Sequence, residues 1–337
     1  MAVRLKDIAR DLGVSVVTVS KVLRGNKDIG DETRRRVLKR MKELNYQPNM
    51  LARGLASGKT YTVGLVVPDL VHPFFAEFAK SLGAVLRESN RALIITSSEE
   101  DPEIERQEIR TLLRRGIDVL LIASCQSNLR NFYELGDERT PYLLFDRNFA
   151  HLAAHFVGSN DVLVGEMATK HLIDTGRTRI AHIAGQGTSP AFDRLRGYRN
   201  AMMDARLEAP EEYIYTGTRL EETGDKVAAK AIQHLLALPQ RPDAVFCYND
   251  LTAIGAIEAV LAADLRVPED IAIIGCGNMP YNDYLKVPLS SIDHGTAELG
   301  RRAGELALDL VSTPEQPPKT ILVPPTLVAR ASTRPTK

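Results

Sequence analysis

Apolar residues in the first 45 positions repeat with the period of an α-helix, in three separate runs. The first run ends at Gly13, a residue type that readily takes the positive φ of a helix end. Ser15 stands where a side chain can cap a second helix, and a third helix is expected from Asp31. The positions expected to face inward are Leu5, Ile8, Ala9 and Leu12, then Val19, Val22 and Leu23, then Val37, Leu38, Met41 and Leu44. Two short helices joined by a Gly turn and supported by a third predict a helix-turn-helix.

From Thr62 onward the pattern changes to short apolar runs that alternate with helix-like segments. The runs are TVGLVVPD, ALIITSS, DVLLIAS, PYLLFDR, RIAHIAG, AVFCYND and IAIIGCG. Buried strands separated by helices are typical of βαβ units, which form parallel sheets. Ligands of such sheets bind at the carboxyl ends of the strands. The predicted fold class is therefore α/β, with a three-helix head before a larger part built on parallel sheets.

Charge is divided unevenly between these two parts, although the chain of 337 residues has a formal net charge of zero. Residues 1–60 hold 14 Lys and Arg against 6 Asp and Glu, a net of +8, and the rest holds 29 against 37, a net of −8. A basic head on an acidic body indicates a nucleic-acid-binding module joined to something else. A solvated basic face would have the same composition.

Composition excludes several other classes of protein. No apolar run approaches the ~20 residues that a membrane span needs. The N-terminus, MAVRLKDIARD, becomes charged too soon for a signal peptide. Cys125, Cys247 and Cys276 are few and far apart, which argues against a disulfide framework or a zinc site. We therefore expect a cytoplasmic protein without a membrane segment, a metal or another cofactor.

The second helix of a helix-turn-helix enters the major groove of DNA, and its N-terminal residues meet the base edges. Val16 and Val17 point away from the predicted core, where valines can contact thymine methyl groups. Lys21 on the same face can donate to guanine, whereas Thr18 and Ser20 can donate to phosphates. Each of these residues taken alone could equally be a solvated surface residue. The predicted DNA-binding set of this helix is Ser15, Val16, Val17, Thr18, Ser20 and Lys21.

The stretches LKDIARDLGVSVVTVSKVLRG and NYQPNMLARGLASGKT closely resemble the LacI/GalR family of bacterial transcription regulators, and the resemblance continues through the rest of the chain. It implies a helix-turn-helix domain at 1–47, a hinge at 48–60 and an effector-binding core at 61–337. The core would resemble periplasmic sugar-binding proteins, with two subdomains and an effector cleft between them. The implied subdomains are about 61–160 with 291–320, and about 161–290 with 321–337.

The family resemblance implies that the hinge forms a helix on operator DNA. Asn49 is a capping residue type, Arg53 would lie near phosphates, and Leu55 would wedge into the minor groove opposite Leu55 of a second subunit. A plain flexible linker is the alternative, because Met50–Ala56 is too short to be helical alone in water. The SGKT of this segment is not a phosphate-binding loop, since that motif needs Gly where Arg53 stands.

The resemblance also implies a homodimer on palindromic operator DNA, paired through the first subdomains. The C-terminal LVARASTRPTK carries no leucine heptads, so a tetramer formed by a tail coiled coil is not expected.

Residues at the predicted strand ends resemble the sugar-binding branch of the family. Phe74 and Phe75 could stack on a sugar ring, although packing at the helix start would explain them as well. Asp146 can accept hydrogen bonds from two hydroxyls, and Arg147 can donate through a planar fork. Asp250 could instead cap the next helix. The effector-binding set implied by the resemblance is His72, Phe74, Phe75, Asp146, Arg147, Arg194, Arg219, Asn249 and Asp250, with Asp69 a weaker candidate.

Two departures from the family pattern affect the cleft. Gly277 stands where relatives usually have an effector-binding Asp, and Arg219 stands where they often have an aromatic residue. Compared with the family pattern, the cleft has one acidic residue fewer and one basic residue more. This change predicts an anionic effector, such as a sugar acid or a sugar phosphate. Alternatively, Arg219 lies on the rim of the cleft or pairs with Glu221 or Glu222. A neutral sugar is then the expected effector.

Two other classes of function are alternatives to a DNA-binding regulator. A solute-binding protein for transport fits the larger part but not the basic head. An enzyme on an α/β scaffold would need a catalytic motif, and HExxH, GxSxG and the phosphate-binding loop are absent from the sequence. His151 and His155 are four residues apart, but they fall in a probable loop without further ligands, so a surface position is expected.

Overall fold

The computed structural model describes residues 3–23, 26, 28–46, 59–127, 129, 132, 135, 140–217 and 224–334. The chain divides into two compact units, Met1–Thr60 and Tyr61–Lys337. Each unit has its own apolar core.

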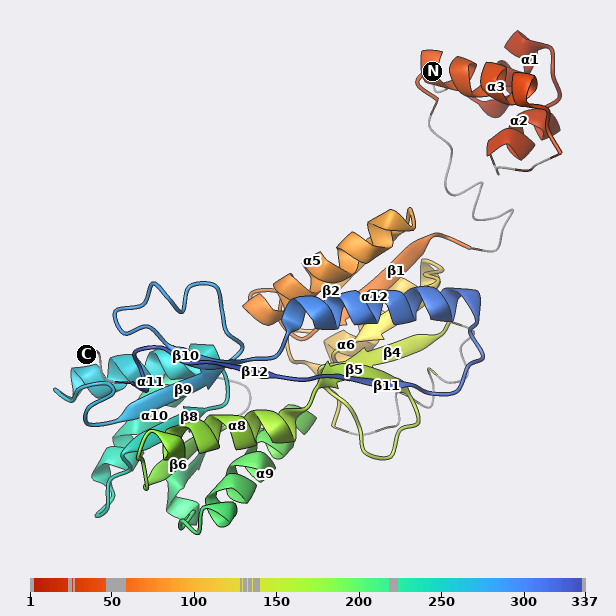
Figure 1. Cartoon of the computed structure of the whole chain (residues 1–337). Helices are drawn as coiled ribbons and strands as arrows, with labels where there is room; N and C mark the ends of the chain where they lie inside the picture. Colours follow the sequence, from red (N-terminus) through yellow and green to blue (C-terminus); the bar gives the residue numbers. More distant parts are fainter. Residues whose placement is uncertain are drawn as a thin grey trace. The chain divides into compact units, whose positions relative to one another are not determined.

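The first unit contains the three expected helices, α1 (Leu5–Leu12), α2 (Val16–Leu23) and α3 (Asp31–Glu43) (Figure 1). Gly13 ends α1 with a φ of 65°, as expected of a left-handed C-terminal residue. The buried core consists of Ile8, Ala9, Val19, Val22, Val37 and Met41. Leu38 was expected in this core, but it is 50% exposed on α3. It neighbours Val37 in sequence, and a helix carries adjacent residues to different faces.

The second unit contains two six-stranded sheets (Figure 1). The first has the order β11-β5-β4-β3-β1-β2, and all its pairs are parallel. Its strands are β1 (Thr62–Val67), β2 (Ala92–Ser97), β3 (Val119–Ile122), β4 (Tyr142–Phe145), β5 (His155–Ser159) and β11 (Thr320–Val323). The helices α5 (Pro73–Glu88) and α12 (Thr296–Ser312) pack on one face, and α6 (Pro102–Arg114) packs on the other. We call this assembly the first subdomain.

The second sheet has the order β12-β10-β9-β8-β6-β7, with only β12 antiparallel. Its strands are β6 (Ile180–Ala184), β7 (Ile214–Thr216), β8 (Ala244–Cys247), β9 (Ala272–Cys276), β10 (Ser290–Asp293) and β12 (Thr326–Val328), and a 3-10 turn, η1 (Glu211–Tyr213), precedes β7. On one face lie α8 (Asp161–Asp174) and α9 (Ser189–Asp204), and on the other α10 (Gly224–Ala237) and α11 (Asp250–Ala262). We call this assembly the second subdomain.

Three segments connect the subdomains: residues 159–161, 293–296 and 323–326. The sequence placed 291–320 in the first subdomain, but residues 291–293 belong to β10, which pairs with β9 in the second sheet. Residues 321–323 belong to β11, which pairs with β5 in the first sheet. An apolar pattern shows that a strand is buried but not which sheet it joins, and for this reason the sequence misplaced these boundaries by a few residues.

His155 also departs from the sequence-based expectation. It was expected in a surface loop, but it is the buried first residue of β5, and its Nδ1 accepts a hydrogen bond from the Lys319 amide at 3.2 Å. The parallel pairing of β11 with β5 brings Lys319 to this position, although it is 164 residues away in sequence.

The three cysteines are buried, and none of them forms a disulfide bond. No cluster of three potential metal-binding side chains occurs within the described ranges. None of the helices that the structure describes is long and apolar enough to cross a membrane.

Candidate functional site

The second helix of the head exposes the two valines that the sequence predicted to face outward. Val16 is 44% and Val17 is 60% exposed, whereas Val19 and Val22 of the same helix are buried. Ser15 caps the helix, because its Oγ accepts a hydrogen bond from the Thr18 amide at 3.0 Å. The same Oγ lies 2.9 Å from the Thr18 hydroxyl. An apolar surface at the start of this helix is suited to contact with thymine methyl groups, and this contact stays a prediction.

Lys21 has an acidic partner that the sequence analysis missed. Its Nζ lies 2.5 Å from Oδ2 of Asp28, and the hydrogen bond from Lys21 lowers the pKa of that carboxyl group. The two residues are seven positions apart, and Asp28 lies beyond the end of α2, so helical periodicity does not pair them. Part of the Lys21 charge expected to reach guanine is thus compensated by Asp28.

Some of the predicted site residues cannot be placed. Asn49, Arg53 and Leu55 of the expected hinge lie outside the described residues, and so does Arg219 of the expected effector site.

Asp146 and Arg147 follow β4, at the carboxyl end of the first sheet. Asp146 has a φ of 59°, an unusual left-handed conformation for a residue other than Gly. Burial raises the pKa of its carboxyl group to about 6, although the nearby Arg147 guanidinium opposes this shift. Arg147 is buried, and its Nη1 and Nη2 donate to the two carboxylate oxygens of Glu100 at 2.9 and 2.6 Å. Asp146 is thus a desolvated acceptor beside an arginine that already has a partner.

Arg194 comes from the second subdomain and is 3% exposed on α9. Its Nε and Nη2 both lie 2.8 Å from Oδ1 of Asp161, the first residue of α8. Its Nη1 donates to the Tyr248 carbonyl at 2.7 Å, and the guanidinium carbon lies 4.7 Å from the centre of the Tyr248 ring. The charges of Arg147, Asp161, Arg194 and Glu100 all act on Asp146, so both subdomains contribute to one polar cluster.

His72 and the two phenylalanines lie at the start of α5. His72 caps the helix, because its Nδ1 accepts a hydrogen bond from the Phe74 amide at 3.3 Å, and burial lowers its pKa. Phe75 is a core residue, with its ring 6.2 Å from that of Phe145. Phe74 is only partly buried, and its ring lies 5.9 Å from that of His294.

His294, which follows β10, was missed by the sequence analysis. It is buried, and its Nε2 lies 2.6 Å from Sγ of Cys276. Burial and the Arg194 charge hold its pKa well below the usual value, and the charge of His72 acts in the same direction. The cluster therefore contains two histidines whose neutral form is favoured by burial.

Asn249 and Asp250 both have internal roles, and the cap of the next helix, considered for Asp250, is Asn249 instead. Asn249 caps α11 through a hydrogen bond from the Thr252 amide at 2.8 Å. Asp250 is 1% exposed, and it accepts hydrogen bonds from the Ser291 hydroxyl, the Met279 amide and the Asn282 side chain at 2.6, 2.9 and 2.8 Å. Asp250 therefore holds the segment after β9 in place.

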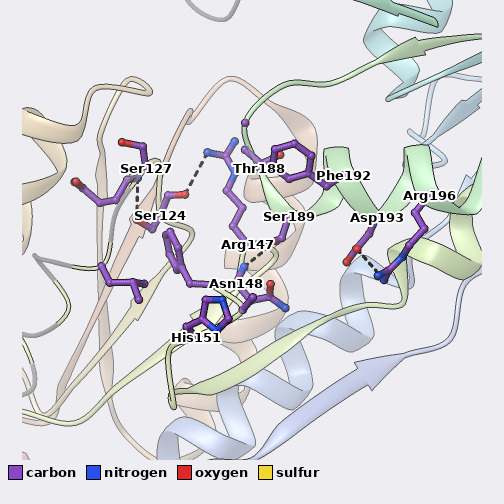
Figure 2. A pocket seen from close by; sticks show the side chains of 15 residues that line it. Ser124, Ser127, Arg147, Asn148, His151, Thr188, Ser189, Phe192, Asp193 and Arg196 are labelled. Atoms are coloured by element: carbon purple, nitrogen blue, oxygen red, sulfur yellow. Dashed lines mark hydrogen bonds and ion pairs between the residues drawn. The ribbon is translucent and has the colours of Figure 1, made fainter. Parts of the chain in front are cut away.

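A cavity of about 730 Å³ lies between the loops after β3 and β4 and the start of α9 (Figure 2). Ser124, Ser127 and Asn148 line it from the first subdomain, and Ser189, Phe192 and Arg196 line it from the second. Arg147 also lines this cavity and thereby joins it to the polar cluster around Asp146. The Asn148 amide donates to the Ser189 hydroxyl at 2.9 Å, which links the two subdomains directly. We use "the cleft" for the cluster and this cavity together.

Comparisons with known proteins agree with this architecture. Residues 4–49 match the family described as bacterial regulatory proteins, lacI family, and residues 169–333 match the periplasmic binding protein-like domain. The ribose operon repressor of Haemophilus influenzae is 36% identical, over 97% of this chain and 98% of the relative. The HTH-type transcriptional repressor PurR of Mannheimia succiniciproducens is 30% identical, over 98% of each chain.

Two solved structures have the same fold over nearly the whole chain. One is described as a complex of the transcriptional regulator CelR with cellobiose. It is 28% identical, covers 98% of this chain and 99% of its own, and has a TM-score of 0.75. The other is the lac repressor dimer bound to operator and an anti-inducer. It is 21% identical, covers 99% of each chain, and has a TM-score of 0.85.

Proposed function

This chain belongs to the LacI family of bacterial regulatory proteins and is a DNA-binding transcription repressor of that type, and we propose that a neutral pentose bound in the cleft sets its affinity for operator DNA. The chain is not an enzyme, since its relatives over the whole length are transcription repressors. A cytoplasmic location, where DNA is accessible, is part of the same proposal.

The observation that carries the proposal is the buried polar cluster formed by Asp146, Arg147 and Arg194. A sugar offers several hydroxyls that both donate and accept, and it needs a carboxylate acceptor beside fixed planar donors. Asp146 supplies the acceptor, and the two arginines supply donors whose positions are fixed by Glu100 and Asp161. Phe74, which is partly buried beside His294, offers an apolar ring surface.

The same contacts favour a neutral effector over the anionic one that Arg219 and Gly277 suggested. Arg147 and Arg194 are each paired with a carboxylate, so their charges are already compensated. A buried charged group without a partner is costly, and an anion entering this site would compete with Glu100 and Asp161 for the same donors. The relatives named ribose operon repressor, which match nearly the whole chain, support a pentose such as ribose.

We further propose that the protein acts as a homodimer on palindromic DNA, because a helix-turn-helix dimer reads two half-sites related by its own symmetry. An apolar groove of about 580 Å³ between β2 and α5 supports this proposal. β2 is an edge strand of the first sheet, and Leu70 and Ile95, which line the groove, are exposed. An exposed apolar edge favours association, and a second copy of the chain would cover it.

Thermal unfolding of the full-length protein with a panel of sugars tests the effector class. At 100 times its dissociation constant, ribose should stabilise the folded state by ~2.7 kcal/mol, which is a measurable shift of the midpoint. D-Arabinose, which differs from D-ribose in the orientation of one hydroxyl, is the matched control and should shift the midpoint less. Stabilisation by sugar acids or sugar phosphates alone would instead support the anionic effector.

The coupling between the sugar-binding cleft and the DNA-binding head is tested with operator DNA. This DNA is selected from a random pool of sequences by its binding to the protein. Ribose should change the dissociation constant for this DNA by about 5–150-fold, the usual range of allosteric coupling, and the DNA should change that for ribose by the same factor. Fluorescence anisotropy measures the first quantity, and calorimetric titration of the complex measures the second. Ribose that binds without altering operator affinity would contradict its role as the effector.

A further inference from the structure

The loop after β2 holds two successive residues in a left-handed conformation. Glu99 has a φ of 50° and Glu100 a φ of 57°. Residues other than Gly are strained in this conformation, and they keep it only where the surroundings fix them. Here the amides of Ser98 and Glu100 donate to the carbonyls of Val67 and Pro68 at 2.9 and 3.1 Å, and the buried Ser98 anchors the loop. The fixed backbone directs the Glu100 carboxylate to Arg147.

Glu100 occupies the end of Arg147 that would otherwise bind an anion. Its two carboxylate oxygens accept from Nη1 and Nη2 at 2.9 and 2.6 Å, the paired geometry in which arginine recognises carboxylates and phosphates. The other carboxylate near Arg147 is that of Asp146, whose Oδ2 lies 3.7 Å from Nε. The Arg147 charge is therefore balanced from within the first subdomain, before any ligand is bound.

Size does not exclude a phosphate group from this position. The cavity of about 730 Å³ lies directly beside Arg147, with Ser124 and Ser127 on one side and Thr188, Ser189 and Phe192 on the other (Figure 2). The other arginine of the cavity wall, Arg196, is also paired, with its Nη2 2.9 Å from Oδ1 of Asp193. The cavity therefore has room for an anion, but both arginines that line it are already paired with carboxylates.

We infer that Glu100 is a specificity-determining residue, which neutralises Arg147 and thereby makes the cleft reject phosphorylated and other anionic sugars. This inference rests on the proposed sugar-binding function. It adds the physical reason why the cleft binds neutral sugars and rejects anionic ones. The repressor would respond to a free pentose and not to the product that a phosphoryl-transfer reaction makes from it. Removing the Glu100 charge should leave Arg147 available to a phosphate in a cavity that has space for one.

The test compares Glu100→Gln with the wild-type protein by calorimetric titration with D-ribose and D-ribose 5-phosphate. The wild type should bind ribose at least a hundredfold more tightly than ribose 5-phosphate. In E100Q this ratio should fall at least tenfold. The matched control is Glu99→Gln, because Glu99 is exposed and has the same left-handed backbone but has no place in the Arg147 pair. E99Q should keep the wild-type ratio.

A second variant and a second ligand separate the possible failures. Glu100→Asp keeps the charge but shortens the side chain, and it should give a smaller fall in the ratio than E100Q; it also serves if E100Q does not fold. An unchanged ratio in both variants would overturn the inference while leaving ribose as the effector. If ribose fails to bind even the wild type, the proposed effector is wrong. Titration with inorganic phosphate then tests the role of Glu100 independently of the effector. Phosphate should bind E100Q at least tenfold more tightly than the wild type, and equal binding overturns the inference.

Discussion

Asp146 is the residue at which ligand binding and fold stability are most directly opposed. Burial raises the pKa of its carboxyl group to about 6 from 3.8, so the folded protein holds this proton more tightly than the unfolded chain does. The stability associated with the protonated form is fully present below pH ~4 and is lost as the pH rises through about 6. At neutral pH the ionised carboxylate therefore destabilises the fold, while it provides the proposed acceptor for sugar hydroxyls.

Asp146→Asn should accordingly raise the melting temperature and weaken ribose binding. The gain in stability over the wild type should grow between pH 4 and pH 6 and then level off, because the variant has no carboxylate to ionise. Ribose affinity should fall at least tenfold. Thermal unfolding at pH 5 and pH 8, with and without ribose, measures both effects. A variant less stable than the wild type at pH 8 would show that the attraction between Arg147 and the Asp146 carboxylate outweighs the cost of burying that carboxylate.

The sequence predicts single residues well where local geometry decides and poorly where distant partners decide. Helical periodicity predicts the exposure of Val16 and Val17. The family pattern predicts that Asp146 follows a strand and that Arg194 lies in a helix. Asp250 has the expected place at a strand end, but its partners Ser291 and Asn282 come from segments more than 30 residues away. Glu100, Asp161 and His294 were missed for the same reason, because only the folded topology brings them to the cleft.

At the scale of secondary structure, the crossing of α8 and α9 positions Arg194. The two helices touch through Gly165 and Gly197, where an added Cβ atom would overlap with the carbonyl oxygens of Arg194 and Val162, respectively. Such overlap leaves no room for a side chain. The sequence predicted both helices from their patterns, but a glycine inside a helix does not reveal which helix it faces.

Gly197→Ala should therefore push α9 away from α8 and move Arg194 relative to Asp161. Overpacking of this kind costs about 1–3 kcal/mol, and the displaced guanidinium should also weaken ribose binding. Met203→Ala is the control, since Met203 lies on the same helix and is exposed. Denaturant unfolding and calorimetric titration measure the two effects. Wild-type ribose affinity in G197A would mean that the helix spacing does not set the position of Arg194.

At the scale of the whole molecule, the apolar edge of the first sheet supports a model in which regulation depends on a second subunit. β2 differs from the central strands of this sheet because none of its residues is buried, and β11 at the opposite edge has a single buried residue, Val323. The sequence predicted β2 as another buried strand, since its apolar run, ALIITSS, looks like the runs of the central strands. Only its position at the edge of the sheet distinguishes it, and a partner surface explains why an edge strand remains apolar.

Ile95→Asp should convert the protein to a monomer, because it places a charge in the groove between β2 and α5. Operator affinity should fall by at least a hundredfold, since two linked heads gain 10²–10⁴ in affinity over one. Ribose binding should persist, because Ile95 is not part of the cleft. Met203→Asp, an equally polar change at an exposed position of the second subdomain, should leave the dimer intact. Light scattering coupled to size-exclusion chromatography measures the molar mass and therefore the oligomeric state. A dimeric I95D with wild-type operator affinity would place the subunit interface elsewhere and leave the apolar edge of β2 unexplained.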